Sequence, residues 1–188
     1  DKQACYATPM VRGRKNPLYV GLALRLKQAR RQSGLKRLPL ATKAGLAAAT
    51  GRDIETGLRL PTIGTIVRLA AALEVSASWL AYGIGDMHIN GAPATCDAMG
   101  ARLQQLRVER GHTKAALARL VGLSPSTVAD IEYGAQTGVE VIEALAKALC
   151  ISPAWLAFNQ GSREVPVRRR LMIDHIYPQE MPRRSPGT

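Results

Sequence analysis

One pattern of residues occurs twice along this chain, first at residues 25–85 and again at residues 102–161. Apolar, charged and glycine residues follow in the same order in both, from Arg25-Leu26 and Arg102-Leu103 onward, with one extra residue in the first copy. One fold must satisfy both stretches, so the repeat constrains the architecture before any single motif is considered. It predicts two small units of about 60 residues, each of which buries too little surface to be very stable alone.

Helix caps and apolar periodicity predict helices throughout both copies and no strands. The first copy is expected to begin its fourth helix at Thr62 or Thr65. Its third helix lacks a capping residue, because Ala47 stands where the second copy has a serine, and Thr50 and Gly51 are alternative starting points. We therefore predict an all-α protein with five helices in each copy. In the second copy, five residues or pairs are expected to begin the helices: Asp97, Thr113, Ser124-Pro125, Val139 and Ser152-Pro153.

The net charge of +12 is distributed unevenly between the two copies. Residues 21–85 carry ten Lys or Arg and three Asp or Glu, whereas residues 98–161 carry six and five. A basic unit with basic flanks is typical of a protein that binds a polyanion. The changes in charge along the chain, together with the repeat, predict five segments. They are a basic arm at 1–20, a first domain at 21–85, a linker at 86–97, a second domain at 98–161 and a basic, proline-containing tail at 162–188.

Each copy contains two short helices joined by a tight turn, at Gly45-Leu46 in the first and Gly122-Leu123 in the second. Glycine suits such a turn because it tolerates the positive φ that a sharp bend often needs. Further pairs recur at matched spacing: Leu40-Ala41, Ile54-Glu55, Leu69-Ala70 and Trp79-Leu80, with Leu117-Ala118, Ile131-Glu132, Leu145-Ala146 and Trp155-Leu156. This pattern resembles the Cro/CI-type (XRE, lambda-repressor-like) helix-turn-helix family over nearly the whole of each copy. The resemblance implies two tandem five-helix DNA-binding domains, and a generic helical repeat is the alternative.

The resemblance implies that the third helix of each copy enters the major groove of DNA and places its first residues against base edges. By position, the DNA-contacting residues of these two helices would be Ala48, Ala49, Thr50, Arg52 and Asp53, and Ser124, Pro125, Ser126, Thr127 and Asp130. Nearby cations are expected to contact phosphates, which adds affinity without sequence information: Lys36, Arg37, Lys43, Arg59 and Lys114. Few of the residues named in the third helix of each copy can make bidentate base contacts, so DNA shape is expected to contribute to specificity.

The resemblance also implies an internal ion pair in each copy, between the first helix and the end of the third. In this sequence the pairs would be Arg30 with Glu55 and Arg107 with Glu132. We interpret both pairs as mainly structural, because each would hold the DNA-reading helix in a fixed orientation against the rest of its unit.

No residues of the sequence form a catalytic or metal-binding pattern, because no nucleophile–base grouping or phosphate loop is present. No apolar run is long enough to span a bilayer, and no secretory leader is visible. We therefore expect a cytoplasmic protein that is not an enzyme, binds no cofactor and does not enter a membrane. The cysteines and histidines, none of them at metal-ligand spacing, are Cys5, Cys96, Cys150, His88, His112 and His175.

Together these features predict a bacterial or phage double-stranded-DNA-binding transcriptional regulator, and a repressor that occludes a promoter is the first interpretation. The alternative is a protein-interaction regulator, of the anti-activator or antitoxin type, in which the near-neutral second domain or the tail binds a protein partner. Two arrangements on DNA are compatible with the sequence: a homodimer, or one chain that serves as a covalent pseudo-dimer on adjacent half-sites.

Overall fold

The computed structural model describes residues 20–88 and 94–164. Within these residues the chain forms helices and no strands, so the predicted all-α fold in two tandem halves is confirmed. The helices of the first repeat are α1 (Val20–Gln32), α2 (Arg37–Lys43), α3 (Ala48–Glu55), α4 (Ile63–Leu73) and α5 (Ala77–Tyr82). Those of the second repeat are α6 (Met99–Glu109), α7 (Lys114–Val121), α8 (Pro125–Glu132), α9 (Val139–Ala148) and α10 (Pro153–Phe158).

Several helices begin at the side-chain caps that the sequence predicts. The hydroxyl of Thr113 caps α7 and that of Ser124 caps α8, each accepting a hydrogen bond from the backbone N–H three residues on. Thr62, rather than Thr65, caps α4 in the same way. Pro125 stands in the first turn of α8, where its missing N–H leaves no helical hydrogen bond unmade. These residues satisfy backbone groups that the helix itself cannot pair.

Two other predicted caps differ from the structure. Asp97 does not cap α6. The backbone N–H of Met99 donates to the carbonyl oxygen of Cys96 at 3.1 Å, and this turn leaves Asp97 outside the helix. Ala98 therefore occupies the cap position, without a side-chain hydrogen bond. Ser152 does precede α10 as predicted, but its hydroxyl makes no capping bond.

α3 begins directly after Ala47 although it has no capping side chain, and neither Thr50 nor Gly51 displaces its start. In the second repeat the place of Gly51 is taken by Val128, whose side chain is fully buried. A Cβ atom on Gly51 would meet nothing within 4 Å. α3 thus lacks both the cap and the apolar contact that anchor α8.

The apolar faces of the helices from both repeats meet in one continuous core within the described residues. Leu26 and Leu69 of the first repeat are fully buried, and so are their counterparts Leu103 and Leu145 in the second. These four shared leucines are therefore core residues. Continuity of the core means that neither repeat has to be stable by itself.

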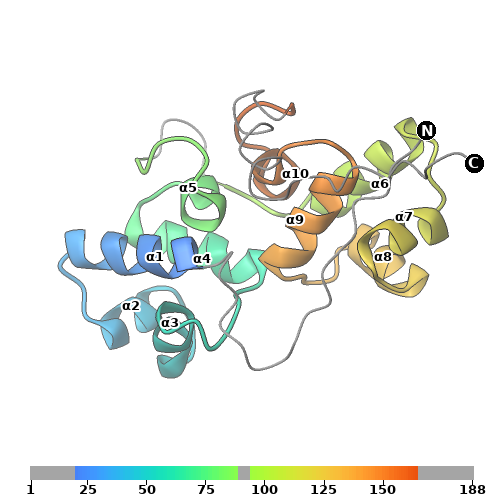
Figure 1. Ribbon diagram of the computed structural model, residues 1–188. Coiled ribbons are helices and arrows are strands. Elements are labelled where there is room, and N and C mark those ends of the chain that lie inside the picture. The colour runs from blue at the N-terminus through green and yellow to red at the C-terminus, as the bar shows by residue number, and fades with distance from the viewer. Residues whose placement is uncertain (1–19, 89–93, 165–188) are drawn as a thin grey trace, which may run out of the picture.

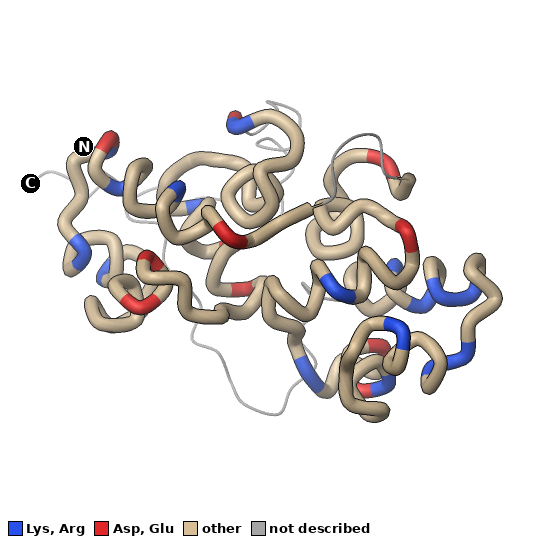
Figure 2. Tube along the Cα trace, turned by 180° about the vertical axis from the view of Figure 1, so that it is seen from behind, with Lys and Arg blue, Asp and Glu red and all other residues tan. Residues whose placement is uncertain are grey.

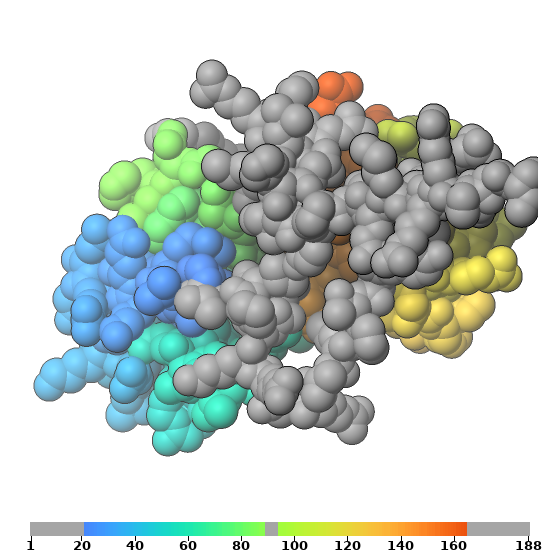
Figure 3. All heavy atoms as spheres, in the orientation of Figure 1, coloured from blue at the N-terminus to red at the C-terminus, as the bar shows by residue number. Residues whose placement is uncertain are grey.

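The two repeats face each other through equivalent elements. α5 packs against α10, its counterpart, in the middle of the molecule (Figure 1). α3 and α8 lie at opposite ends, both on the side of the molecule away from α5 and α10. In the space-filling view (Figure 3), the first repeat is seen at one end in blue to green, and α7 and α8 at the other in yellow.

The repeated structure continues past the predicted domain ends at residues 85 and 161. After α5 the chain returns to the start of the same helix, where the N–H of Ser76 donates to the carbonyl oxygen of Met87 at 2.8 Å. After α10 the N–H of Ser152 donates to the carbonyl oxygen of Arg163 at 2.9 Å. Met87 and Arg163 hold the same place in the two repeats, and the Arg163 side chain also pairs with Glu109. Each repeat therefore includes the turn that closes it.

Some sequence predictions fall outside the described residues. These are the basic arm up to residue 19, the middle of the linker at 89–93, and the basic tail from residue 165 onward, and they stay predictions.

Candidate nucleic-acid interface

α2 with α3, and α7 with α8, form two helix-turn-helix units at the predicted places. Gly45 in the first turn has a φ of +61°, and Gly122 in the second has a φ of +70°. Both values lie in the left-handed region, which glycine adopts without steric cost. The turn packs the two short helices of each unit against each other and leaves one face of α3 and of α8 open to solvent.

α3 presents to solvent the residues that the resemblance assigns to DNA. Ala48, Ala49 and Arg52 are exposed, and Thr50 and Asp53 are partly buried. The Arg52 Nε atom lies 3.2 Å from the Asp53 Oδ1 atom, so a cation and an anion stand side by side on this face. The first repeat therefore offers a methyl-bearing start to the helix, followed by one long cationic side chain.

α8 presents a different surface from the same positions. Ser124, Pro125, Ser126 and Asp130 are exposed, and Thr127 is partly buried. The Ser124 hydroxyl lies 2.8 Å from that of Ser126 and 2.7 Å from that of Thr127. The start of α8 is therefore a cluster of hydroxyl groups without a cation.

A buried glutamate joins the helices of the first repeat. The Arg30 Nε atom lies 2.5 Å from one carboxylate oxygen of Glu55, and the Arg37 Nε atom lies 2.9 Å from the other. Arg30 also donates to the carbonyl oxygen of Leu35. Burial raises the pKa of the Glu55 carboxyl, but the hydrogen bonds from the two arginines outweigh it and hold that pKa below its usual value. Ion pairs with one carboxylate, that of Glu55, thus connect α1, α2 and α3.

The second repeat contains the same arrangement. The Arg107 Nε atom lies 2.6 Å from Glu132 Oε1, and the Lys114 Nζ atom lies 3.6 Å from Glu132 Oε2. The ion pairs Arg30–Glu55 and Arg107–Glu132 therefore stand where the resemblance places them. Arg37 and Lys114, which the sequence assigns to phosphates alone, also neutralise these glutamates.

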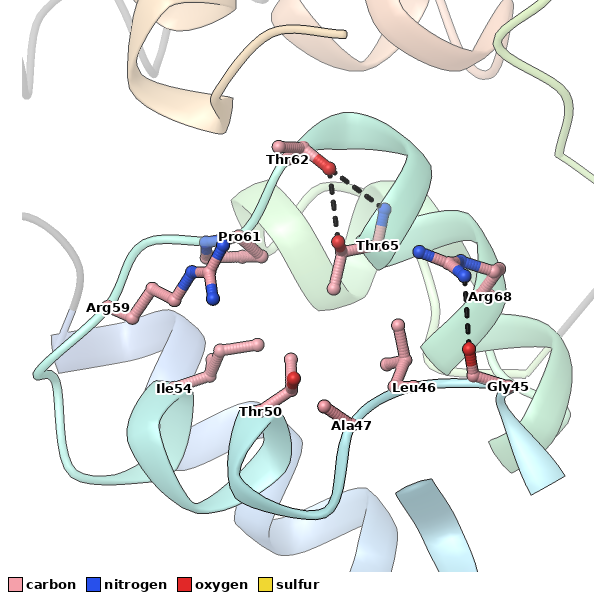
Figure 4. A pocket seen from close by; sticks show the side chains of 10 residues that line it. All are labelled: Gly45, Leu46, Ala47, Thr50, Ile54, Arg59, Pro61, Thr62, Thr65 and Arg68. Carbon is pink, nitrogen blue, oxygen red and sulfur yellow. Dashed lines mark hydrogen bonds between the residues drawn. The ribbon is translucent and has the colours of Figure 1, made fainter. Parts of the chain in front are cut away.

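A notch of about 220 Å³ opens between α3 and α4 of the first repeat (Figure 4). Arg59 and Arg68 enter it from opposite sides, and Arg68 donates to the carbonyl oxygen of Gly45 at 3.1 Å. The hydroxyls of Thr62 and Thr65 lie 3.0 Å apart at its upper wall. Its lining contains no Asp or Glu. The notch is therefore a cationic hollow beside the exposed face of α3.

The second repeat does not reproduce this cationic hollow. Ala144 stands in the place of Arg68, and the residues that follow Gly134 are neutral where Arg59 follows Gly57. The fold itself therefore does not require these two arginines, because the other copy forms the same helices without them.

Two family models match the chain, one over each repeat. Residues 26–80 match the family described as "Helix-turn-helix", and residues 98–157 match the one described as "Helix-turn-helix domain". The chain carries two tandem helix-turn-helix domains of the Cro/CI type. Such domains mark the tandem helix-turn-helix protein as a DNA-binding regulator in general terms, and families of this kind are typically not enzymes. Comparison with curated proteins and with solved structures gave no significant match.

Lysines and arginines lie on both repeats of the tandem helix-turn-helix protein (blue in Figure 2), but they outnumber the carboxylates strongly only in the first repeat. Lys43 is among them, and its Nζ atom lies 3.2 Å from Glu74 Oε1 in an exposed pair. Because exposed pairs are weak, this lysine can exchange its carboxylate for a phosphate at little cost. The electrostatic attraction for a polyanion is therefore concentrated on one half of the protein.

Sequence reasoning missed two residues at this surface. Arg68 lies in the middle of α4, and only folding brings it to the notch beside the turn of the first repeat. Tyr133 follows α8 and is 84% exposed, with the Lys114 Nζ atom 5.2 Å from the centre of its ring. An aromatic residue where the first copy has Thr56 was a visible signal for Tyr133. Arg68 had no such signal.

Among the described residues of the tandem helix-turn-helix protein, no group of three His, Cys, Asp or Glu side chains is placed to hold a metal ion. No helix in these ranges has the length and apolar character needed to cross a bilayer.

Proposed function

We propose that this protein binds double-stranded DNA in a sequence-specific way and regulates transcription, acting as a repressor that occludes a promoter. The observation that carries the proposal is the open face of α3 in a strongly basic repeat, where the Arg52 side chain is 62% exposed. A helix held this way by a helix-turn-helix unit fits the major groove, and its first residues reach base edges. The cytoplasm of a bacterium is the compartment that suits such a regulator.

Phosphate contacts would come from the cations that surround α3. Arg59 and Arg68 flank the notch beside this helix, and Lys43 is exposed in the last turn of α2. The Nε–H group of Arg37 donates to Glu55, and the other N–H groups of this guanidinium can donate to a phosphate, since the side chain is 48% exposed. These contacts position the protein on DNA, while α3 itself supplies the sequence preference.

Binding of duplex DNA as a function of salt concentration tests this function. We expect the affinity to fall as salt rises, since each phosphate contact releases counterions. Arg52→Ala should reduce discrimination between sequences, whereas Arg110→Ala, which removes an exposed arginine at the end of α6, should not. Absence of duplex binding even at low salt would exclude the DNA-binding proposal for the first repeat.

The second repeat supports one alternative, a regulator in which this half binds a protein. Its charge is nearly balanced, and Tyr133 is an exposed aromatic residue of the kind enriched in protein interfaces. If Lys114→Ala and Ser126→Ala leave DNA affinity unchanged, the second repeat is the candidate partner-binding half. If they weaken DNA binding, both repeats contact DNA.

A further inference from the structure

The two repeats meet through residues that hold the same position in each copy. Thr62 and Gly138, the residues before α4 and α9, form an isolated antiparallel bridge. The N–H of Ile63 donates to the carbonyl oxygen of Thr137 at 2.9 Å. The reverse bond runs from the N–H of Val139 to the carbonyl oxygen of Pro61 at 3.2 Å. Since Ile63 corresponds to Val139, and Pro61 to Thr137, each bond is the image of the other.

The helices that close the two repeats continue this pattern. α5 packs on α10, and the rings of Tyr82 and Phe158, again equivalent residues, have centroids 6.2 Å apart. Val75 and Ile151 are equivalent members of the core that runs through both repeats. An interface in which equivalent residues meet is isologous, and it requires a two-fold rotation between the two units. The chain therefore has the internal symmetry of a two-fold dimer, although it is a single polypeptide.

A two-fold arrangement presents α3 and α8 to DNA as a matched pair. Both helices lie on the side of the molecule away from α5 and α10 (Figure 1). Helix-turn-helix dimers use such a pair to occupy two half-sites, with a separation fixed by the protein. Here that separation is set by the bonds between Thr62 and Gly138 and by the α5–α10 packing.

The two reading surfaces differ, although the scaffold is symmetric. Ala49 of α3 is replaced by Ser126 in α8, and Arg52 is replaced by Ala129. Only the Thr and Asp of the set are shared, as Thr50 with Thr127 and Asp53 with Asp130. A homodimer would present the same side chains to both half-sites, but this chain cannot.

We propose that one chain occupies two half-sites of unlike sequence at a single fixed spacing, so that its DNA target is a non-palindromic pair of blocks. The inference rests on the proposed DNA-binding function and adds stoichiometry and target symmetry to it. One molecule suffices, because the faces through which the two units associate are already in contact within the chain.

Selection of duplexes from a random-sequence pool by the full chain tests the inference. We expect the recovered sequences to contain two different blocks at one spacing, and native mass spectrometry to find one chain on each duplex. Inserting or deleting a base pair between the blocks should reduce affinity at least tenfold. A ten-residue Gly/Ser insertion after Asn90 should leave the preferred spacing unchanged, because the interface sets it.

A variant that gives α8 the surface of α3 provides the sharpest test. Pro125→Ala, Ser126→Ala and Ala129→Arg together reproduce the exposed residues of α3 at the matching positions. The selected target should then become a near-palindrome, with the block read by α3 unchanged and the other converted to its inverted copy. Circular dichroism of the triple variant is the control for folding: a wild-type spectrum is expected.

The outcomes separate this inference from the function on which it rests. Recovery of no duplex at all would contradict DNA binding itself. Recovery of one block only, of a palindrome by the wild-type chain, or of two chains per duplex would overturn the inference and leave DNA binding intact. A single block would also favour the second repeat as a protein-binding half.

Discussion

Gly100 of α6 lies so close to the end of α8 that a Cβ atom would overlap the carbonyl oxygens of Ile131 and Glu132. This contact brings the first helix of the second repeat directly against the last turn of α8. The equivalent position in the first repeat is Ala23, where a methyl group is accommodated. The close approach is therefore specific to the second repeat.

We expect Gly100→Ala to destabilise the protein by about 1–3 kcal/mol, because the backbone atoms that it meets cannot move aside cheaply. Gly51→Ala is the matched control, since a Cβ there meets nothing within 4 Å and the helix gains backbone rigidity. It should stabilise the protein by about 0.5–1 kcal/mol. Denaturant unfolding measures both, and equal effects of the two substitutions would contradict the close contact at Gly100.

The ion pair between Arg107 and Glu132 should be far more important for stability than the exposed pair between Lys43 and Glu74. Arg107→Met leaves a buried carboxylate that, among the described cations, only Lys114 approaches, and we expect a loss of about 3–5 kcal/mol. Lys43→Ala should cost about 0–1 kcal/mol, because both members of that pair are exposed. Thermal unfolding of the two variants side by side distinguishes the pairs, and a loss below 1 kcal/mol for Arg107→Met would show that the pair is not structural.

Glu55 should make the protein sensitive to acid. Its pKa is lowered in the folded state, so its contribution to stability is complete above its ordinary pKa of 4.5 and is lost as the pH falls through the folded value. The free energy of unfolding should therefore drop below pH 4.5 less steeply in Glu55→Gln than in the wild type. Urea unfolding at a series of pH values measures the two slopes, and parallel curves would contradict the assignment.

Glu140 should show the opposite dependence. Burial raises the pKa of its carboxyl, and its Oε2 atom has no hydrogen-bond partner among the residues that the structure describes. A raised pKa means that stability is greatest in acid and decreases as the pH rises from 4.5 through the folded value. Glu140→Gln should remove this decrease, and the same urea series detects it. If Glu140→Gln is instead less stable than the wild type at pH values above the folded pKa, the ionised carboxylate has a stabilising partner.

Arg59 and Arg68 should contribute to DNA affinity without contributing to sequence preference. Replacement of either by alanine is expected to weaken binding to all duplexes similarly and to reduce the slope of log affinity against log salt by about 1. Arg110→Ala should leave the slope unchanged. A change in the selected sequence after Arg59→Ala would show that this side chain reads bases instead.

Local signals in the sequence predicted the helices and their order well. Thr113, Ser124 and Thr62 cap helices through hydrogen bonds within three residues, and such bonds are legible from residue type and spacing. Asp97 failed as a cap because a nearby backbone bond between Met99 and Cys96 set the start of α6 instead. Caps compete with turns, and sequence spacing alone does not rank them.

Contacts between residues far apart in the chain lay beyond sequence reasoning. Nothing in the residue types of Thr62 and Gly138 indicates that they pair, since their bridge consists of backbone bonds. The approach of Gln136 to Gly64, which has no Cβ to block it, likewise depends on how the two repeats dock. The repeat predicted two similar units, and their two-fold relation required the structure.

The hydroxyl of Tyr82 donates to the carbonyl oxygen of Val139 at 3.2 Å, and Phe158, its counterpart, has no hydroxyl to return that bond. In a homodimer every substitution appears on both sides at once, and both copies must tolerate it. A single chain that carries both units is free of this constraint, because a change in one half of it is made only once. Each half of the protein, from the interface to α3 or α8, can therefore change independently while the pairing geometry is kept.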